Sequence, residues 1–92
     1  MPFQCPVCGY DELRRPPAEF LICSSCGTEF GLDDADPDHS PEIVYERLRD
    51  AWIARAMPWF SRVTHAPQGW DPYAQLLGAG LLVRFVREDT PR

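Results

Sequence analysis

One short cysteine pattern occurs twice in this chain, as CPVCGY at residues 5–10 and as CSSCGT at residues 23–28. In each copy, two residues separate the cysteines and a glycine follows the second one. This spacing is typical of a knuckle, a tight turn whose two sulfur atoms point the same way. Gly9 and Gly27 stand where such a turn leaves through a backbone conformation that is unfavourable for a residue with a side chain. The repeat therefore predicts two matching knuckles.

Four thiolates in two knuckles can surround one tetrahedral metal ion. A cysteine-bound Zn²⁺ has Zn–S bonds of about 2.3 Å, and four sulfur ligands leave no position for water or substrate. Two such units at this separation indicate a structural zinc site rather than a catalytic one. Iron in a rubredoxin-like site uses the same ligands, so the pattern does not separate the two metals. The predicted ligands are Cys5, Cys8, Cys23 and Cys26.

The start of the chain and its apolar runs indicate a cytoplasmic protein. Residues 1–8 lack the positive region and apolar stretch of a signal peptide. No apolar run approaches the roughly 18 to 20 residues that a membrane helix needs. We therefore expect no membrane contact.

Disulfides and redox chemistry are the other uses of paired cysteines. A C-x2-C pair closes a strained small ring, and disulfides are rare in a reducing cytosol. A thioredoxin-like motif needs one pair at the start of a helix in a strand-helix-strand context, and neither pair has that setting. Metal binding is the stronger interpretation.

Length and charge limit the remaining classes of function. The chain of 92 residues is expected to form a single domain over 1–92, and one so small needs a cross-link or a metal for stability. Fourteen acidic residues outweigh nine arginines, there is no lysine, and the net charge is −5. On average this surface should repel a nucleic-acid backbone. Arg14 and Arg15 have acidic neighbours and are interpreted as part of a solvated turn.

Residues 3–32 are predicted to form a zinc ribbon of two or three short antiparallel strands. The chain bends at Pro16 and Pro17, and residues 19–22 (EFLI) then resemble a strand that leads into the second knuckle. Residues 28–32 (TEFGL) can pair as another strand that ends at Gly31. Because so small a sheet is not stable alone, the expected fold class is α+β. In this fold the ribbon packs with one main amphipathic helix and a second short helix.

An acidic linker is expected over residues 33–40. It lacks the ligand spacing of an EF-hand calcium loop. Its negative charge favours the positive end of the helix that follows. His39 is interpreted as a solvated loop residue and not as a fifth ligand.

The main helix is predicted over residues 41–57. Ser40 is a suitable N-cap, Pro41 suits the first helical position and Pro58 stops the helix. Apolar residues recur at helical spacing and charged residues take the other face. The apolar set is Val44, Leu48, Ala51 and Trp52, and the charged set is Glu46, Arg47, Arg49 and Asp50.

Residues 58–92 are expected to comprise an aromatic segment, a short helix and a C-terminal tail. Large rings at Trp59, Phe60, Trp70 and Tyr73 either cover the open side of the sheet or stay exposed as anchors for a partner. Asp71 is predicted to cap a helix that starts at Pro72 and ends at Gly78. Residues 81–88 (LLVRFVRE) read as an edge strand that could pair with the ribbon or form a homodimer with a second copy of the chain. A continued helix is the alternative for this tail.

Three stretches, CPVCGY, ICSSCGTEFGLDD and WIARAMPWFSR, resemble small bacterial cysteine-rich zinc-ribbon proteins related to the family named for its CPCC motif. The resemblance covers residues 3–77. The chain departs from the name-giving motif, since Val7 and Cys8 stand where the family has adjacent cysteines. From this resemblance we carry over only metal binding at the four cysteines, and it implies no catalytic role. A regulatory or immunity-type role is suspected for some members of the group.

These observations together favour a non-enzymatic, zinc-stabilised module that binds another protein. The alternative is a nucleic-acid-binding zinc ribbon, which the charge disfavours. An enzyme is disfavoured because four cysteines close the metal shell and no phosphate loop, nucleophile elbow or paired acid-base motif is present.

Overall fold

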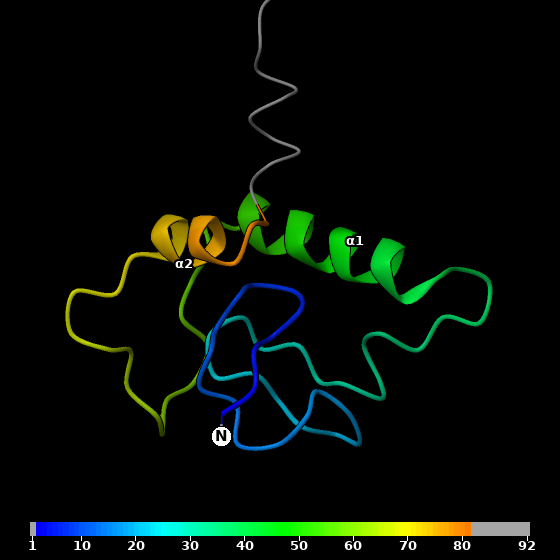
Figure 1. The fold of residues 1–92 in the computed structure, drawn as a ribbon, viewed down its shortest axis with the longest axis horizontal. Coiled ribbons are helices and arrows are strands. Elements are labelled where there is room, and N and C mark those ends of the chain that lie inside the picture. The colour runs from blue at the N-terminus through cyan, green and yellow to red at the C-terminus, as the bar shows by residue number, and fades with distance from the viewer. Residues whose placement is uncertain (1, 82–92) are drawn as a thin grey trace, which may run out of the picture.

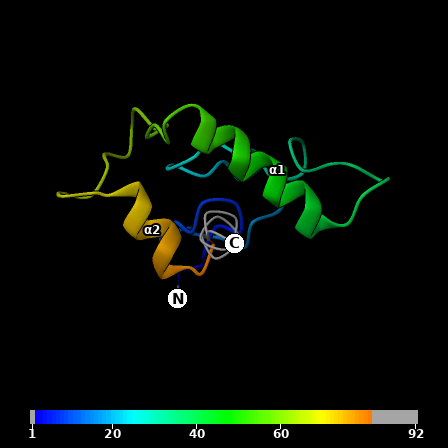
Figure 2. The same ribbon diagram turned by 90° about the horizontal axis from the view of Figure 1, so that it is seen from above.

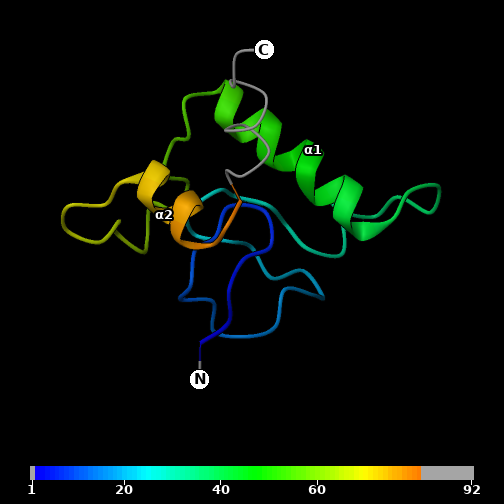
Figure 3. The ribbon, with the colours of Figure 1, turned by 45° about the horizontal axis from the view of Figure 1, so that its top comes forward.

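The structure of this protein is a computed structural model that describes residues 2–81. It contains two helices, α1 at Pro41–Ala54 and α2 at Pro72–Gly78. Both helices lie on the same side of the N-terminal loops that carry the cysteines (Figures 1 and 3). Seen from above, α1 and α2 flank these loops, and the connection between the helices runs around one end (Figure 2).

The predicted α+β fold class is wrong. Residues 2–81 contain helices and loops but no strand, and therefore no sheet. Two isolated antiparallel bridges, between Phe3 and Leu13 and between Ile22 and Glu29, are all that stands where the ribbon was expected. The N-terminal third of the protein is a pair of looped knuckles on which the helices pack.

Backbone geometry explains why the expected strands do not form. Glu19 and Phe20 have φ values of 51° and 67°, in the left-handed region that extended chain cannot use. Gly31 has a φ of 90°. The amide of Asp33 donates to the carbonyl of Glu29 at 2.8 Å, so the chain turns where residues 28–32 were expected to extend. Each knuckle consequently keeps only a single bridge next to it.

Helix α1 begins as predicted but ends three residues early. Pro41 occupies its first turn and Ser40 is the N-cap residue, although the Ser40 side chain makes no capping hydrogen bond. Val44 and Trp52 are buried, whereas Ala51, expected on the apolar face, is exposed.

The end of α1 is set by two residues in left-handed conformations. Ala56 and Met57 have φ values of 69° and 52°, and the amide of Met57 donates to the carbonyl of Trp52 at 2.9 Å. This bond closes the last turn and carries the chain away from the helix axis. The helix has therefore already ended before Pro58, which was expected to stop it.

Replacing Ala56 by glycine is expected to stabilise the protein. A residue with a Cβ is strained in the left-handed region, and glycine removes that strain. We expect the free energy of unfolding to rise by roughly 0.5–1 kcal/mol. The matched control is Ala51→Gly at an exposed site within α1, which should lower it by about 1 kcal/mol. Chemical denaturation that found both variants equally destabilised would contradict this account of the helix end.

Helix α2 is capped as the sequence predicts. The Asp71 carboxylate accepts hydrogen bonds from the amides of Tyr73 and Ala74, at 3.0 and 3.3 Å. Leu76 is fully buried and anchors the helix. The Asp71 cap and the buried Leu76 fix which face of α2 packs against the knuckles.

Residues 33–40 form a series of turns. The carboxylates of Asp33 and Asp34 accept from the amides of Glu29 and Gly31, at 2.8 and 2.7 Å. His39 remains exposed, with its Nδ1 atom 2.9 Å from Asp36 Oδ2. The amide of Asp38 and the His39 ring hold the pKa of Asp36 below its usual range. His39 therefore pairs with the acidic turn and lies apart from the cysteines.

The aromatic residues divide into a buried or half-buried group and an exposed group. Trp52 is buried, and Trp59 and Trp70 are half-buried in edge-to-face contact with ring centroids 5.1 Å apart. They pack against the core that surrounds the knuckles, because no sheet exists within residues 2–81 for them to cover. Phe60 and Tyr73, by contrast, are 55% and 58% exposed.

The core of the protein is built around the cysteines themselves. The largest fully buried side chains other than cysteine are Trp52, Phe30, Leu76 and Val7, which come from both helices and both loops. Neither helix within residues 2–81 is long and apolar enough to cross a membrane. The predicted C-terminal strand and its homodimer lie outside the described residues, apart from Leu81.

Candidate metal centre

The two knuckles have the same backbone hydrogen bonds. In the first, the Cys5 amide donates to the Tyr10 carbonyl at 2.7 Å and the Gly9 amide donates to the Cys5 carbonyl at 2.9 Å. In the second, Cys23 donates to Thr28 at 3.0 Å and Gly27 donates to Cys23 at 2.9 Å. Gly9 and Gly27 have φ values of 88° and 82°. The repeat in the sequence is thus a repeat in backbone structure.

The four predicted ligand cysteines come together in the fold. Their sulfur atoms all lie within 4.8 Å of one another, and all four residues are buried. The contacts join the knuckles: Cys5 Sγ lies 3.9 Å from Cys26 Sγ, and Cys8 Sγ lies 3.7 Å from Cys23 Sγ. Among the described residues, this is the only group of potential metal ligands that the structure assembles.

These distances fit a metal ion and not disulfides. A regular tetrahedron with Zn–S bonds of about 2.3 Å places its sulfur atoms about 3.8 Å apart. A disulfide would need about 2.05 Å between the sulfurs, and all four cysteines are free. Cys5, Cys8, Cys23 and Cys26 could therefore hold one metal ion, to which they would supply four thiolates in a closed shell.

The electrostatics of the cluster favour a cation at its centre. Hydrogen bonding to Cys23 and Cys26, together with burial, raises the pKa of both Cys5 and Cys8 above that of a free thiol. Hydrogen bonds from Cys23, Cys5 and Cys8 lower the pKa of Cys26 instead. Four buried thiolates repel one another and lose hydration, so a divalent cation is the natural counter-charge that would let all four ionise.

Different donors satisfy the equivalent carbonyls of the two knuckles. In the first, the Arg49 guanidinium donates to Pro6 and Val7, at 2.9 and 2.7 Å. In the second, the amides of Ser61 and Phe60 donate to Ser24 and Ser25, at 2.9 and 3.1 Å. Arg49 was expected with the charged residues opposite the apolar face of the helix; it is half-buried, and its side chain reaches the first knuckle.

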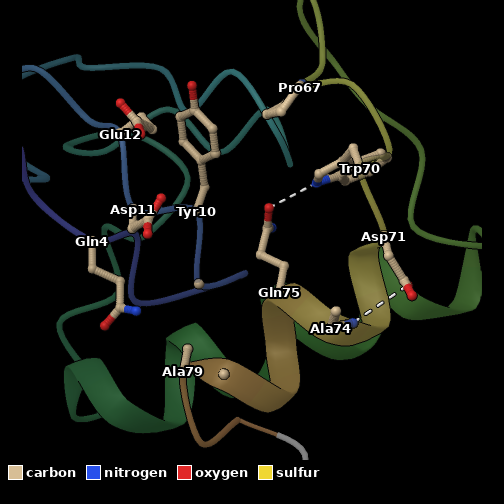
Figure 4. A pocket seen from close by; sticks show the side chains of 12 residues that line it. Gln4, Tyr10, Asp11, Glu12, Pro67, Trp70, Asp71, Ala74, Gln75 and Ala79 are labelled. Carbon is tan, nitrogen blue, oxygen red and sulfur yellow. Dashed lines mark hydrogen bonds between the residues drawn. The ribbon is translucent and has the colours of Figure 1, made fainter.

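Gln75 of α2 joins the two knuckles to each other. Its Nε2 atom donates to the Cys8 carbonyl at 3.1 Å and to the Ser25 hydroxyl at 3.0 Å. Its Oε1 atom accepts from Trp70 Nε1 at 2.8 Å, as Figure 4 shows. One side chain therefore holds both halves of the cysteine cluster and the aromatic segment.

The two knuckle glycines also let α2 and the Phe60 ring approach the knuckle backbone closely. A Cβ on Gly9 would lie 2.8 Å from the Gln75 carbonyl oxygen and 2.8 Å from Ala79 Cβ. A Cβ on Gly27 would lie 2.5 Å from the Phe60 ring. The backbone of α2 covers the first knuckle and the ring of Phe60 covers the second.

Sequence reasoning missed the roles of Arg49, Gln75 and Phe60 in holding the knuckles. The only available signal was the repeat itself, since each knuckle exposes carbonyls that need hydrogen-bond donors. Arg49 lies 42 positions from the carbonyl of Val7 that it binds, and Gln75 lies 67 positions from that of Cys8. No local pattern marks them.

The site and the fold define a small helical protein built on a four-cysteine cluster. No protein-family model matches the chain, and neither the curated proteins nor the solved structures contain a match to it.

Replacing Gln75 by leucine is expected to loosen the cluster. The change leaves the buried Cys8 carbonyl and Ser25 hydroxyl, and the half-buried Trp70 indole, without their partner. A buried group in that state costs about 1–3 kcal/mol. We expect a loss of roughly 2–4 kcal/mol of stability in the metal-loaded protein. The matched control is Gln68→Leu at an exposed site of the same connection. Equal melting temperatures for the two variants would contradict the bridging role.

Proposed function

We propose that this chain is a zinc-stabilised, non-enzymatic module that binds another protein in the cytoplasm. One observation carries the first half of the proposal: four buried sulfur atoms lie at the separations of a tetrahedral site. Zinc is the metal best suited to a closed shell of four cysteines, and such a shell offers no open position for catalysis. A reducing compartment keeps the thiols available for it.

Exposed apolar side chains support the second half. Phe60, Tyr73 and Leu77 are 55%, 58% and 65% exposed, on the connection and the short helix that cover the knuckles. Aromatic side chains held on a rigid support are common anchors in protein interfaces. The metal would make that support rigid, because both knuckles and α2 converge on it.

Elemental analysis tests the metal. Protein purified without added metal is expected to contain one zinc per chain. Iron at the same stoichiometry would change the identity of the ion, and a folded protein without any metal would refute the proposal.

Affinity capture followed by reconstitution from purified components tests the partner. We expect a direct complex with the zinc-loaded protein that is lost after the metal is removed with a strong chelator. A complex that formed equally well with the metal-free protein would contradict a role for the metal in binding.

A further inference from the structure

A pocket opens beside the cysteine cluster, between the end of α1 and the second knuckle. Its volume is about 710 Å³. The residues that line it are Cys26, Arg55, Pro58, Trp59, Phe60 and Arg62. We refer to it as the Arg55–Arg62 pocket.

The charge of this pocket is opposite to that of the protein. The chain carries a net charge of −5, yet the lining contains two arginines and no carboxylate. Within residues 2–81, the structure gives neither arginine an ion pair with an acidic residue. In the described part of the chain, the Arg55 guanidinium donates one long hydrogen bond of 3.4 Å, to the Ala51 carbonyl of its own helix. Both guanidinium groups can therefore bind a ligand that comes from another molecule.

Phe60 provides a preorganised apolar contact in the same pocket. Its amide donates to Ser25 in the second knuckle, and its ring packs against Gly27. More than half of the side chain nevertheless stays exposed. An aromatic ring whose backbone is already fixed loses little entropy when a ligand covers it.

Unfavourable backbone conformations shape the wall of the pocket. The left-handed residues Ala56 and Met57 lie directly between Arg55 and Pro58. Strained residues of this kind are concentrated at ligand sites, where the surrounding structure holds them in place. Here the strained turn brings the end of α1 and the Trp59–Phe60 segment to one pocket. Trp59 is held in turn by a hydrogen bond from Nε1 to the Thr64 carbonyl at 2.9 Å.

We propose that the Arg55–Arg62 pocket binds an acidic segment of the partner protein, with carboxylates next to one large apolar side chain. This inference rests on the proposed function and names its docking surface. Guanidinium groups pair with carboxylates in bidentate geometry, and the apolar side chain would pack on the Phe60 ring. A short acidic segment needs only these two arginines, whereas an extended nucleic-acid backbone would meet the acidic remainder of the surface.

Fluorescence anisotropy with labelled pentapeptides tests this proposal. The panel places glutamate and aspartate on both sides of a central phenylalanine, tryptophan or leucine, and the control peptides carry glutamine and asparagine instead. We expect the acidic peptides to bind zinc-loaded protein, and their binding to weaken with rising salt. The double variant Arg55→Gln with Arg62→Gln should bind at least tenfold more weakly, and Phe60→Ala should also weaken binding. The matched control removes the same charge elsewhere, through Arg14→Gln with Arg15→Gln, and should change the affinity less than twofold.

Three results would overturn the inference. They are no binding by any acidic peptide, an equal loss in both double variants, or tighter binding of a ten-residue oligothymidylate that depends on the same two arginines. Zinc content is measured for every variant. Normal zinc content and partner binding without peptide binding would refute this pocket alone, whereas folded wild-type protein without any metal would refute the proposed function.

Discussion

The variant Cys23→Ser should lose its metal and unfold. Structural zinc in small domains contributes an apparent free energy of about 10–16 kcal/mol, whereas the whole stability of a small domain is about 5–15 kcal/mol. A serine at position 23 would remove one ligand and the contact between Cys8 Sγ and Cys23 Sγ. Elemental analysis and circular dichroism at 25 °C would measure the two losses together.

The control for this variant lies in the same knuckle. Ser24 is half-buried between the two cysteines of the knuckle, and its side chain makes no hydrogen bond within residues 2–81. Ser24→Ala should keep one zinc per chain and most of the stability. Should Cys23→Ser retain the metal and the melting temperature of the wild type, the four-cysteine site would have to be abandoned.

The second large effect is expected at Gly9, where α2 meets the first knuckle. An alanine there would be strained at a φ of 88° and would place its Cβ 2.8 Å from the backbone of Gln75. Left-handed geometry alone costs about 1–2 kcal/mol, and forcing apart a packed helix adds a further 1–3 kcal/mol. We therefore expect Gly9→Ala to lower the free energy of unfolding by roughly 2–5 kcal/mol.

Gly69 allows the two contributions at Gly9 to be separated. It has a φ of 74°, and nothing lies within 4 Å of the position that its Cβ would take. Gly69→Ala should therefore carry the conformational cost alone, about 1–2 kcal/mol. Denaturation curves for both variants in the zinc-loaded protein give their losses in free energy of unfolding. The difference between the two losses is the packing contribution at Gly9. If the two losses were the same, α2 would not depend on close contact with the knuckle.

Features fixed by a few neighbouring residues were predicted well. Asp71 caps α2, Pro41 opens α1, and the cysteine spacing with Gly9 and Gly27 correctly indicated both turns. The expected strands failed because residues 19–22 look extended in the sequence but contain two left-handed residues. A short apolar run does not by itself establish a strand, and here Phe20 and Ile22 stay exposed in the turn.

The residues that hold the cluster could not be predicted in the same way. Arg49 lies on the expected charged face of α1, and Gln75 is a single polar residue in a short helix. Their hydrogen bonds reach carbonyls far away in the chain, so their roles depend on how α1 and α2 are placed. The same is true of Arg55 and Arg62, which become neighbours of one pocket only after the chain turns at Ala56 and Met57.

The sequence by itself determined the four sulfur atoms, the two knuckles that present them and the starts of both helices, because bonds between residues close in the chain set each of these. Only the tertiary structure decided that loops rather than strands connect the cysteines, that Arg49 and Gln75 hold the knuckles, and that two arginines share a pocket beside Cys26. Those contacts join distant segments, and their free energy is gained only when the whole chain is packed.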